Sequence, residues 1–395
     1  MASLISSQPQ LLSQLNERKV LQVLHSHGPS SRAEVSRLAD VTRPTVSKAV
    51  SSLLKSGLLE EYDAPENLRG RPAKKLRLAV KTAQVLGLVI DAPTCCLVST
   101  GLDGVVRSET LCEFKTPRTY EQLLKKVTEL VSQSRSLAGV RTLGVGISMP
   151  GLFDYRAGLS ILSPNVPITN KQRLGADLSR RLGLDCVVLQ ESDALCLAER
   201  HYGLARGVDD FAMLDASTGI GLGVLTASRL LKGSNGLAGE IGHLPMDPNG
   251  IPCGCGRTGC LETLASDTAL TRLVSQRVGR DLDIHQIIDL VQADELNVAA
   301  ELDSVAQHLA FALVTTINLF NPQTLFVHSR MFDIDPPLFE CLIERTEAMA
   351  LAPSFRSCHI ARARGSKHEG AIAGILAHLT DSRVSQSNSH SLEAL

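Results

Sequence analysis

The sequence predicts an α/β protein with a small helical module at its N-terminus and a larger two-lobed body. Three observations carry this prediction. Apolar residues recur at helical spacing over residues 16–57, broken by turn signals. From Val85 onward, short β-rich runs alternate with helical stretches, and this pattern occurs twice. With 395 residues the chain can form two or three cores, so we expect domains at 1–82 and 83–380 and a disordered tail at 381–395, where serine and other polar residues prevail.

The N-terminal module is expected to hold three helices. The first covers residues 16–27 and ends at Gly28-Pro29. Ser31 and Glu34 form a capping box that opens a short second helix. Thr42 is expected to cap a third helix, which Gly57 ends.

Two helices joined by a tight turn have the layout of a helix-turn-helix, whose second helix enters the major groove of DNA. Its outward side chains can bond base edges and phosphates. Residues 1–82 carry 13 Lys and Arg against 7 Asp and Glu, whereas the whole chain has a net charge of −1. A basic end on an acidic body is expected when that end meets a polyanion. The candidate DNA contacts on this helix are Thr42, Arg43, Thr45, Ser47 and Lys48.

A β-hairpin with a basic tip is expected to follow. Leu58–Tyr62 and Leu76–Leu78 flank the turn-rich, basic segment 67–75. Arg69 and Arg71 in Arg-Gly-Arg-Pro suit a narrow minor groove. Taken alone, the segment also fits a solvated charged linker, but its place after the helix-turn-helix favours a wing.

The body shows two strand-rich units that each trail helices, and ligands in such folds usually bind between lobes. The first unit is expected to hold strands at 85–91, 95–100, 105–106 and 143–149 and a helix at 120–136. The second is expected to hold strands at 211–214, 222–225, 325–327 and 359–361 and helices at 263–279, 297–320 and 336–350.

One imidazole and three thiols lie close together in a glycine-rich stretch. His243, Cys253, Cys255 and Cys260 form a Cys3His set for one tetrahedral zinc ion per chain. With four protein ligands the zinc would be structural, which leaves no open position for a zinc-dependent hydrolase. Reduced thiols in a turn, or a disulfide with one cysteine left over, are the alternatives.

Composition excludes several classes of protein. No apolar run approaches a membrane-spanning length, and the N-terminus lacks the pattern of a signal peptide. The other cysteines are scattered among apolar neighbours, as expected in a reducing cytoplasm. Tryptophan is absent and aromatics make up 3% of residues, so polar side chains must recognise the ligand.

From about Gln10 to His378 the chain resembles the ROK family of repressors, open reading frames and kinases, in particular its sugar-responsive repressor branch. The residues that carry the resemblance are Gly239–His243 and Cys253–Glu262, with Asn16–Leu59 similar to the winged helix-turn-helix of the repressors. The resemblance implies an actin-like, ribonuclease H-like ATPase fold in the body. It also implies a sugar site at Asn165, Asp193, Glu240, His243 and Glu262, and the convergent acceptors of such a site suit a polyhydroxyl ligand.

The nucleotide elements of the kinases in this family are altered here. An Asp-x-Gly-Gly-Thr turn is replaced by Asp91-Ala92-Pro93-Thr94, and a Gly-Thr-Gly loop by Ser217-Thr218-Gly219. A Gly-Gly pair is replaced by His328-Ser329, and the asparagine before the catalytic aspartate, Asp193, by Ser192. Phosphoryl transfer depends on holding the phosphates, so we expect no catalytic residues in this chain.

These observations predict a sugar-responsive transcription factor, with a repressor of carbohydrate genes as the main interpretation. Its partners would be double-stranded operator DNA, a monosaccharide or sugar phosphate, and a second copy of the chain in a homodimer or homotetramer. An active sugar kinase with an accessory DNA-binding domain is the alternative, which Asp193 supports and the Asp91–Thr94 segment opposes.

Overall fold

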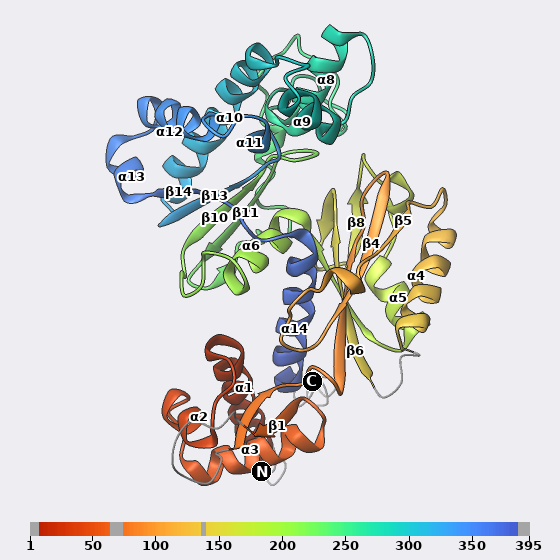
Figure 1. Ribbon diagram of the computed structural model, residues 1–395, viewed down its shortest axis with the longest axis vertical. Coiled ribbons are helices and arrows are strands. Elements are labelled where there is room, and N and C mark those ends of the chain that lie inside the picture. Colours follow the sequence, from red (N-terminus) through yellow and green to blue (C-terminus); the bar gives the residue numbers. More distant parts are fainter. Residues whose placement is uncertain (1–7, 64–73, 136–139, 386–395) are drawn as a thin grey trace. The chain divides into compact units, whose positions relative to one another are not determined.

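The computed structural model describes residues 8–63, 74–135 and 140–385 (Figure 1). The chain divides into two compact units. The first combines residues 1–147, 175–188 and 371–395, and the second combines 148–174 and 189–370. No unit boundary falls at residue 82, so the N-terminal module belongs to the same compact unit as the first part of the body.

Three helices form in the N-terminal module, as the sequence predicts, but the first begins at residue 8 rather than at residue 16. They are α1 (Gln8–His27), α2 (Arg32–Leu38) and α3 (Arg43–Lys55). The capping box of α2 is confirmed, because Glu34 N–H donates to Ser31 and Ser31 N–H donates to Glu34, at 3.3 and 2.7 Å. Thr42 stands at the N-cap of α3 but makes no capping hydrogen bond, and its hydroxyl pairs instead with that of Thr45 at 2.9 Å.

A hairpin follows α3. Strands β1 (Leu59–Asp63) and β2 (Lys74–Leu78) pair antiparallel, with Leu59 opposite Leu78 and Asp63 opposite Lys74. Arg69 and Arg71, the expected tip residues, lie outside the described residues.

The first unit is built on a five-stranded sheet in the order β5-β4-β3-β6-β9. Its strands are β3 (Ala83–Val89), β4 (Thr94–Thr100), β5 (Cys112–Lys115), β6 (Arg141–Met149) and β9 (Asp185–Gln190). Its helices are α4 (Tyr120–Arg135), α5 (Leu174–Leu182) and most of α14 (Lys367–Ser385). The strand expected at Val105-Val106 is wrong: the Leu102–Gly104 turn leads into irregular chain, and β5 begins only at Cys112.

One hydrophobic cluster joins the N-terminal helices to this sheet and to the C-terminal helix. Val50 and Leu53 of α3, Val85 of β3 and Ile372 and Ile375 of α14 are all members of it, and each is fully buried. The two ends of the sequence therefore share a core.

The second unit contains the sheet β12-β11-β10-β13-β14. Its central strand β10 pairs antiparallel with β11 and parallel with β13, which pairs parallel with β14. The strands are β10 (Phe211–Asp215), β11 (Gly221–Thr226), β12 (Arg229–Leu230), β13 (Thr324–His328) and β14 (His359–Arg362), with a separate hairpin of β7 (Leu152–Asp154) and β8 (Leu159–Leu162). The helices are α6 (Glu191–His201), α7 (Glu262–Ala265), α8 (Asp267–Val278), α9 (Ile284–Gln292), α10 (Ala299–Phe320), α11 (Met331–Ile334), α12 (Leu338–Met349) and α13 (Ala352–Ser357).

Two expected elements differ in extent. The helix expected over 263–279 is broken at Ser266, which is extended and whose hydroxyl accepts from Ala269 N–H to cap α8. The tail expected from residue 381 begins later, because α14 continues to Ser385; the rest of the expected tail lies outside the described residues. Within the described parts of the chain, no helix is long and apolar enough to cross a membrane.

Candidate ligand pocket and metal centre

The metal-binding candidates lie on a loop that is held by its own backbone. His243 ends the short 3-10 turn η3 (Ile241–His243), and Cys260 comes two residues before α7. Cys253 N–H donates to the Arg257 carbonyl at 2.7 Å, which closes the turn that carries Cys255. Gly259 has φ +65°, and a Cβ there would lie 1.6 Å from the Asp247 carbonyl oxygen, so the loop tolerates only glycine at this position.

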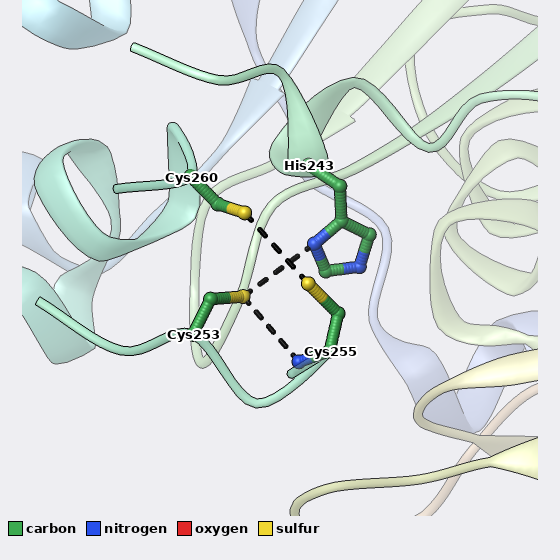
Figure 2. Close-up of side chains that lie close together, drawn as sticks. All are labelled: His243, Cys253, Cys255 and Cys260. Carbon is green, nitrogen blue, oxygen red and sulfur yellow. Dashed lines mark hydrogen bonds between the residues drawn. The ribbon is translucent and has the colours of Figure 1, made fainter. Parts of the chain in front are cut away.

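The four donor atoms converge (Figure 2). All lie within 4.8 Å of one another. Cys253 Sγ is 3.6 Å from His243 Nδ1, and Cys255 Sγ is 3.7 Å from Cys260 Sγ. Sulfur ligands about 2.3 Å from a tetrahedral metal are about 3.8 Å apart, so these separations match the edges of one coordination tetrahedron. The cluster can hold a metal ion.

A cavity of about 290 Å³ adjoins this cluster within the second unit. Four of the five expected sugar ligands line it: Asn165, Glu240, His243 and Glu262. Asn165 is exposed in the loop after β8, whereas the other three are half-buried. Gly239, with φ +90°, brings Glu240 into place, because a Cβ at Gly239 would lie 1.9 Å from the Leu222 carbonyl oxygen.

The two glutamates flank His243. Glu240 accepts from Gln190 Nε2 at 3.1 Å and lies 3.8 Å from His243 Nε2, while burial raises the pKa of Glu240. Glu262 accepts from the Cys253 thiol at 2.8 Å and lies 3.8 Å from His243 Nδ1. A ligating thiolate carries no proton, so the Cys253–Glu262 hydrogen bond belongs to the metal-free protein.

Asp193, the fifth expected ligand, does not line this cavity. Its side chain is 8% exposed, and the Lys232 ammonium forms an ion pair with its Oδ2. The Tyr155 hydroxyl donates to the same oxygen at 2.7 Å, and the Lys232 ammonium nitrogen also lies 3.7 Å from the centre of the Tyr155 ring. The chain's own side chains therefore neutralise this carboxylate.

The Ser217–Gly219 loop, compared above with a phosphate loop of the kinases, begins with a side chain bound to Asp215. Asp215, at the end of β10, accepts from the Ser217 hydroxyl at 2.7 Å and from His328 Nδ1 at 2.9 Å. Burial opposes ionisation of Asp215, but Lys367 and His328 outweigh it and hold the pKa of Asp215 well below its ordinary range. Ser329 donates through its hydroxyl to Asp267 at 2.6 Å. Both residues that replace the glycine pair are thus bound to buried carboxylates.

The Asp91–Thr94 turn, in the first unit, is also held by hydrogen bonds to Asp91. Ala92 N–H donates to the carboxylate of Asp91 at 2.8 Å, and Pro93 has no N–H. The Asp91 carbonyl accepts from the Thr116 hydroxyl at 2.5 Å. Neither residue between Asp91 and Thr94 offers a free amide to a phosphate.

The expected DNA contacts lie along the first two turns of α3. Thr42, Arg43 and Lys48 are exposed, and Thr45 and Ser47 are half-buried. The opposite face of the helix packs inward through Val46, Val50 and Leu53, which are at most 1% exposed.

Comparison with known proteins agrees with this fold. The ROK family profile matches residues 94–381, so this chain belongs to the ROK family. The N-acetylglucosamine repressor of Escherichia coli O157:H7 is 26% identical over 86% of both chains. The xylose repressor of Bacillus subtilis is 26% identical over 82% of this chain and 84% of its own.

Solved structures extend the likeness to repressors and kinases alike. A ROK family transcriptional regulator, described as a homologue of the Escherichia coli MLC protein, superposes with a TM-score of 0.79. It is 23% identical and covers 95% of this chain and 99% of its own. The ROK hexokinase of Thermus thermophilus is 28% identical with a TM-score of 0.62, and covers 75% of this chain and 98% of its own.

Several residues of the site gave no signal in the sequence. Lys232 and Tyr155 lie 39 and 38 residues from Asp193 in the chain, and Lys367 lies 176 residues from Glu191, its partner at 2.5 Å. A lone lysine is ordinarily solvated, so only the fold reveals these pairings. Gln190, which joins Glu240 to the end of β9, was also missed.

Proposed function

We propose that this chain is a sugar-responsive DNA-binding repressor of carbohydrate uptake or catabolism genes. The observation that carries the proposal is the N-terminal module of three helices and a hairpin in front of a ROK body. Relatives named as repressors match over more than four-fifths of this chain, whereas the hexokinase structure covers 75% of it.

In this proposal the module is a winged helix-turn-helix. Helix α3 lies in the major groove with Thr42, Arg43, Thr45, Ser47 and Lys48 toward bases and phosphates, and Arg69 and Arg71 reach the minor groove or clamp phosphates. Such modules bind paired half-sites, so the chain acts as a homodimer or a homotetramer.

The body senses the sugar. Carboxylate and amide oxygens of Asn165, Glu240 and Glu262 accept from ligand hydroxyls. One structural zinc on His243, Cys253, Cys255 and Cys260 holds the loop that carries the two glutamates, and supplies no reaction chemistry because all four positions are taken by protein. His243 uses Nδ1 for the metal, which leaves Nε2 for Glu240 or the sugar.

The test is an operator titration with and without sugar. Sugar and operator must weaken each other by the same factor, and a switch of this kind typically couples by about 5- to 150-fold. Glu240→Ala and Glu262→Ala should remove sugar binding and leave operator binding intact. A sugar that binds but leaves operator affinity unchanged would refute the sensor.

A sugar kinase is the competing function, since Asp193 and the hexokinase-like fold are both present. Three features of the chain oppose it. Lys232 neutralises Asp193, the Asp91–Thr94 turn offers no amides between its ends, and Ser217 and His328 are bound to Asp215. A coupled assay with ATP and common hexoses should give turnover far below about 1 per second, an ordinary kinase rate. Turnover at that rate that Asp193→Asn abolishes would establish the kinase instead.

A further inference from the structure

The charges around the cavity of the second unit indicate which form of sugar it accepts. Four carboxylates line it: Glu191, Asp215, Glu240 and Glu262. Arg272 is the single lysine or arginine among the residues that line it. Its guanidinium donates to the Thr263 carbonyl at 2.9 Å.

The nearby lysines are already paired with carboxylates. Lys367 lies 2.5 Å from Glu191 Oε1 and 3.9 Å from Asp215 Oδ2, so its one charge is shared between two acids. Lys232 is paired with Asp193. For Lys232 to turn toward a ligand anion, it would have to leave a carboxylate that is 8% exposed, and an unpaired buried charge is costly.

Glu240 and Glu262 have no such counter-charge. Within the described residues, the basic nitrogens within 4.0 Å of either carboxylate belong to His243, at 3.8 Å. A metal-ligating histidine is neutral, and three thiolates more than cancel the charge of a divalent ion. Within the described residues, neither glutamate of this wall is paired with a lysine or an arginine.

We propose that this pocket selects an unphosphorylated sugar and rejects the corresponding sugar phosphate. This inference rests on the proposed sugar-sensing function and makes it more specific. The hydroxyls of a sugar donate hydrogen bonds to carboxylates. A phosphate ester carries about −1.5 to −2 charges at neutral pH, and its oxygens accept hydrogen bonds, which ionised carboxylates cannot donate. The lining of the cavity provides four carboxylates and a single arginine.

Calorimetry on the full-length, metal-loaded protein tests this with matched pairs of ligands. The probes are glucose and glucose 6-phosphate, and N-acetylglucosamine and its 6-phosphate. In whichever pair binds, the neutral sugar should bind about a hundredfold or more tighter than its phosphate. The phosphate would bring its negative charge beside several carboxylates in one site of low dielectric. A phosphate that binds as tightly as its neutral sugar overturns this inference and leaves the sugar sensor standing. Failure of every neutral and phosphorylated sugar, xylose included, overturns the sugar sensor itself.

Charge-removing variants separate electrostatics from shape. Glu240→Gln and Glu262→Gln keep the size of the side chain, and each should reduce the discrimination against phosphate about tenfold. Glu295→Gln, which removes an exposed carboxylate that does not line the cavity, should leave it unchanged. If a glutamine variant binds neither ligand, the salt dependence of binding to the parent protein provides the test. Added sodium chloride should reduce the ratio between the affinity for the neutral sugar and the affinity for its phosphate. Discrimination that is insensitive both to these substitutions and to salt overturns the proposal.

Discussion

Glu60 accepts a 2.8 Å hydrogen bond from the backbone N–H of Lys81. The same carboxylate oxygen accepts from the N–H groups of Val80 and Thr82, at 3.1 and 3.2 Å. Burial opposes ionisation of Glu60, but hydrogen bonds from Lys81 and Val80 outweigh it and lower the pKa of Glu60. One side chain of the hairpin thereby holds the segment that leads into β3.

Glu60→Ala should lower the free energy of unfolding by about 2 kcal/mol, because three backbone donors lose a charged acceptor. Glu61→Ala is the matched control: Glu61 pairs with an exposed arginine, Arg32, and such pairs contribute under about 1 kcal/mol. The pKa of Glu60 is lowered in the folded state, so Glu60 stabilises the protein at pH values above its pKa in the unfolded chain. This stabilisation is lost as the pH falls through the pKa of Glu60 in the folded protein. Urea unfolding at neutral and acidic pH measures both effects. Equal losses in the two variants at pH 7 would contradict this account of Glu60.

Metal removal should destabilise the second unit. Elemental analysis of the purified protein should find about one zinc per chain, and a chelator should lower the melting temperature and the sugar affinity together. Cys255→Ser should reproduce the effect of the chelator. Cys112→Ser, at an exposed cysteine of the first unit, should leave both unchanged. A parent protein without bound metal, or a Cys255→Ser variant with normal stability, would count against the assignment.

Lys48→Ala should weaken operator binding and reduce the slope of log affinity against log salt by about one, because one phosphate contact is lost. Lys55, in the last turn of the same helix, serves as the control, since recognition helices contact bases through their N-terminal residues. Arg71→Ala is expected to behave as Lys48→Ala does. Binding isotherms at several salt concentrations measure the slopes. If Lys48→Ala and Arg71→Ala both bind as the parent does, the DNA-binding module has been assigned wrongly.

The metal loop could be predicted from sequence because its chemistry is local, whereas Asn165, Glu240 and Glu262 were expected in the pocket through the resemblance to the ROK family. His243 to Glu262 fall within two dozen positions, and ligand spacing is a property of the chain itself. The neutralisation of Asp193 could not be predicted, because it depends on how Lys232 and Tyr155 meet it in the fold.

The missed helices have local explanations. Helix α6 starts at Glu191 directly after β9, and no side chain caps it, so no start signal marks it. Helix α14 contains Gly370 and Gly374, which lower its helix propensity. Tertiary packing of Ile372 and Ile375 offsets that cost.

His328 should make stability depend on pH. Burial lowers the pKa of His328, but its hydrogen bond to Asp215 and the charge of that residue outweigh this and raise the pKa above the ordinary value. The stabilisation is then fully present below about pH 6.5, the unfolded value, and is lost as pH rises through the folded pKa. Urea unfolding from pH 5.5 to 9 should show a larger loss for the parent than for His328→Gln. His308→Gln, at a half-buried histidine of α10 that bonds within its own helix, should follow the parent. Parallel curves for the parent and His328→Gln would contradict the pairing with Asp215.

The core shared by α3, β3 and α14 bears on when the protein can act during its synthesis. Ile372 and Ile375 of α14 follow Val50 and Leu53 of the proposed recognition helix by more than 300 residues, yet all four belong to one hydrophobic cluster. Domains usually fold from the N-terminus as they emerge. Here the N-terminal module cannot complete its core until α14 has been synthesised. A chain that stops before α14 therefore lacks part of the packing behind the proposed recognition helix.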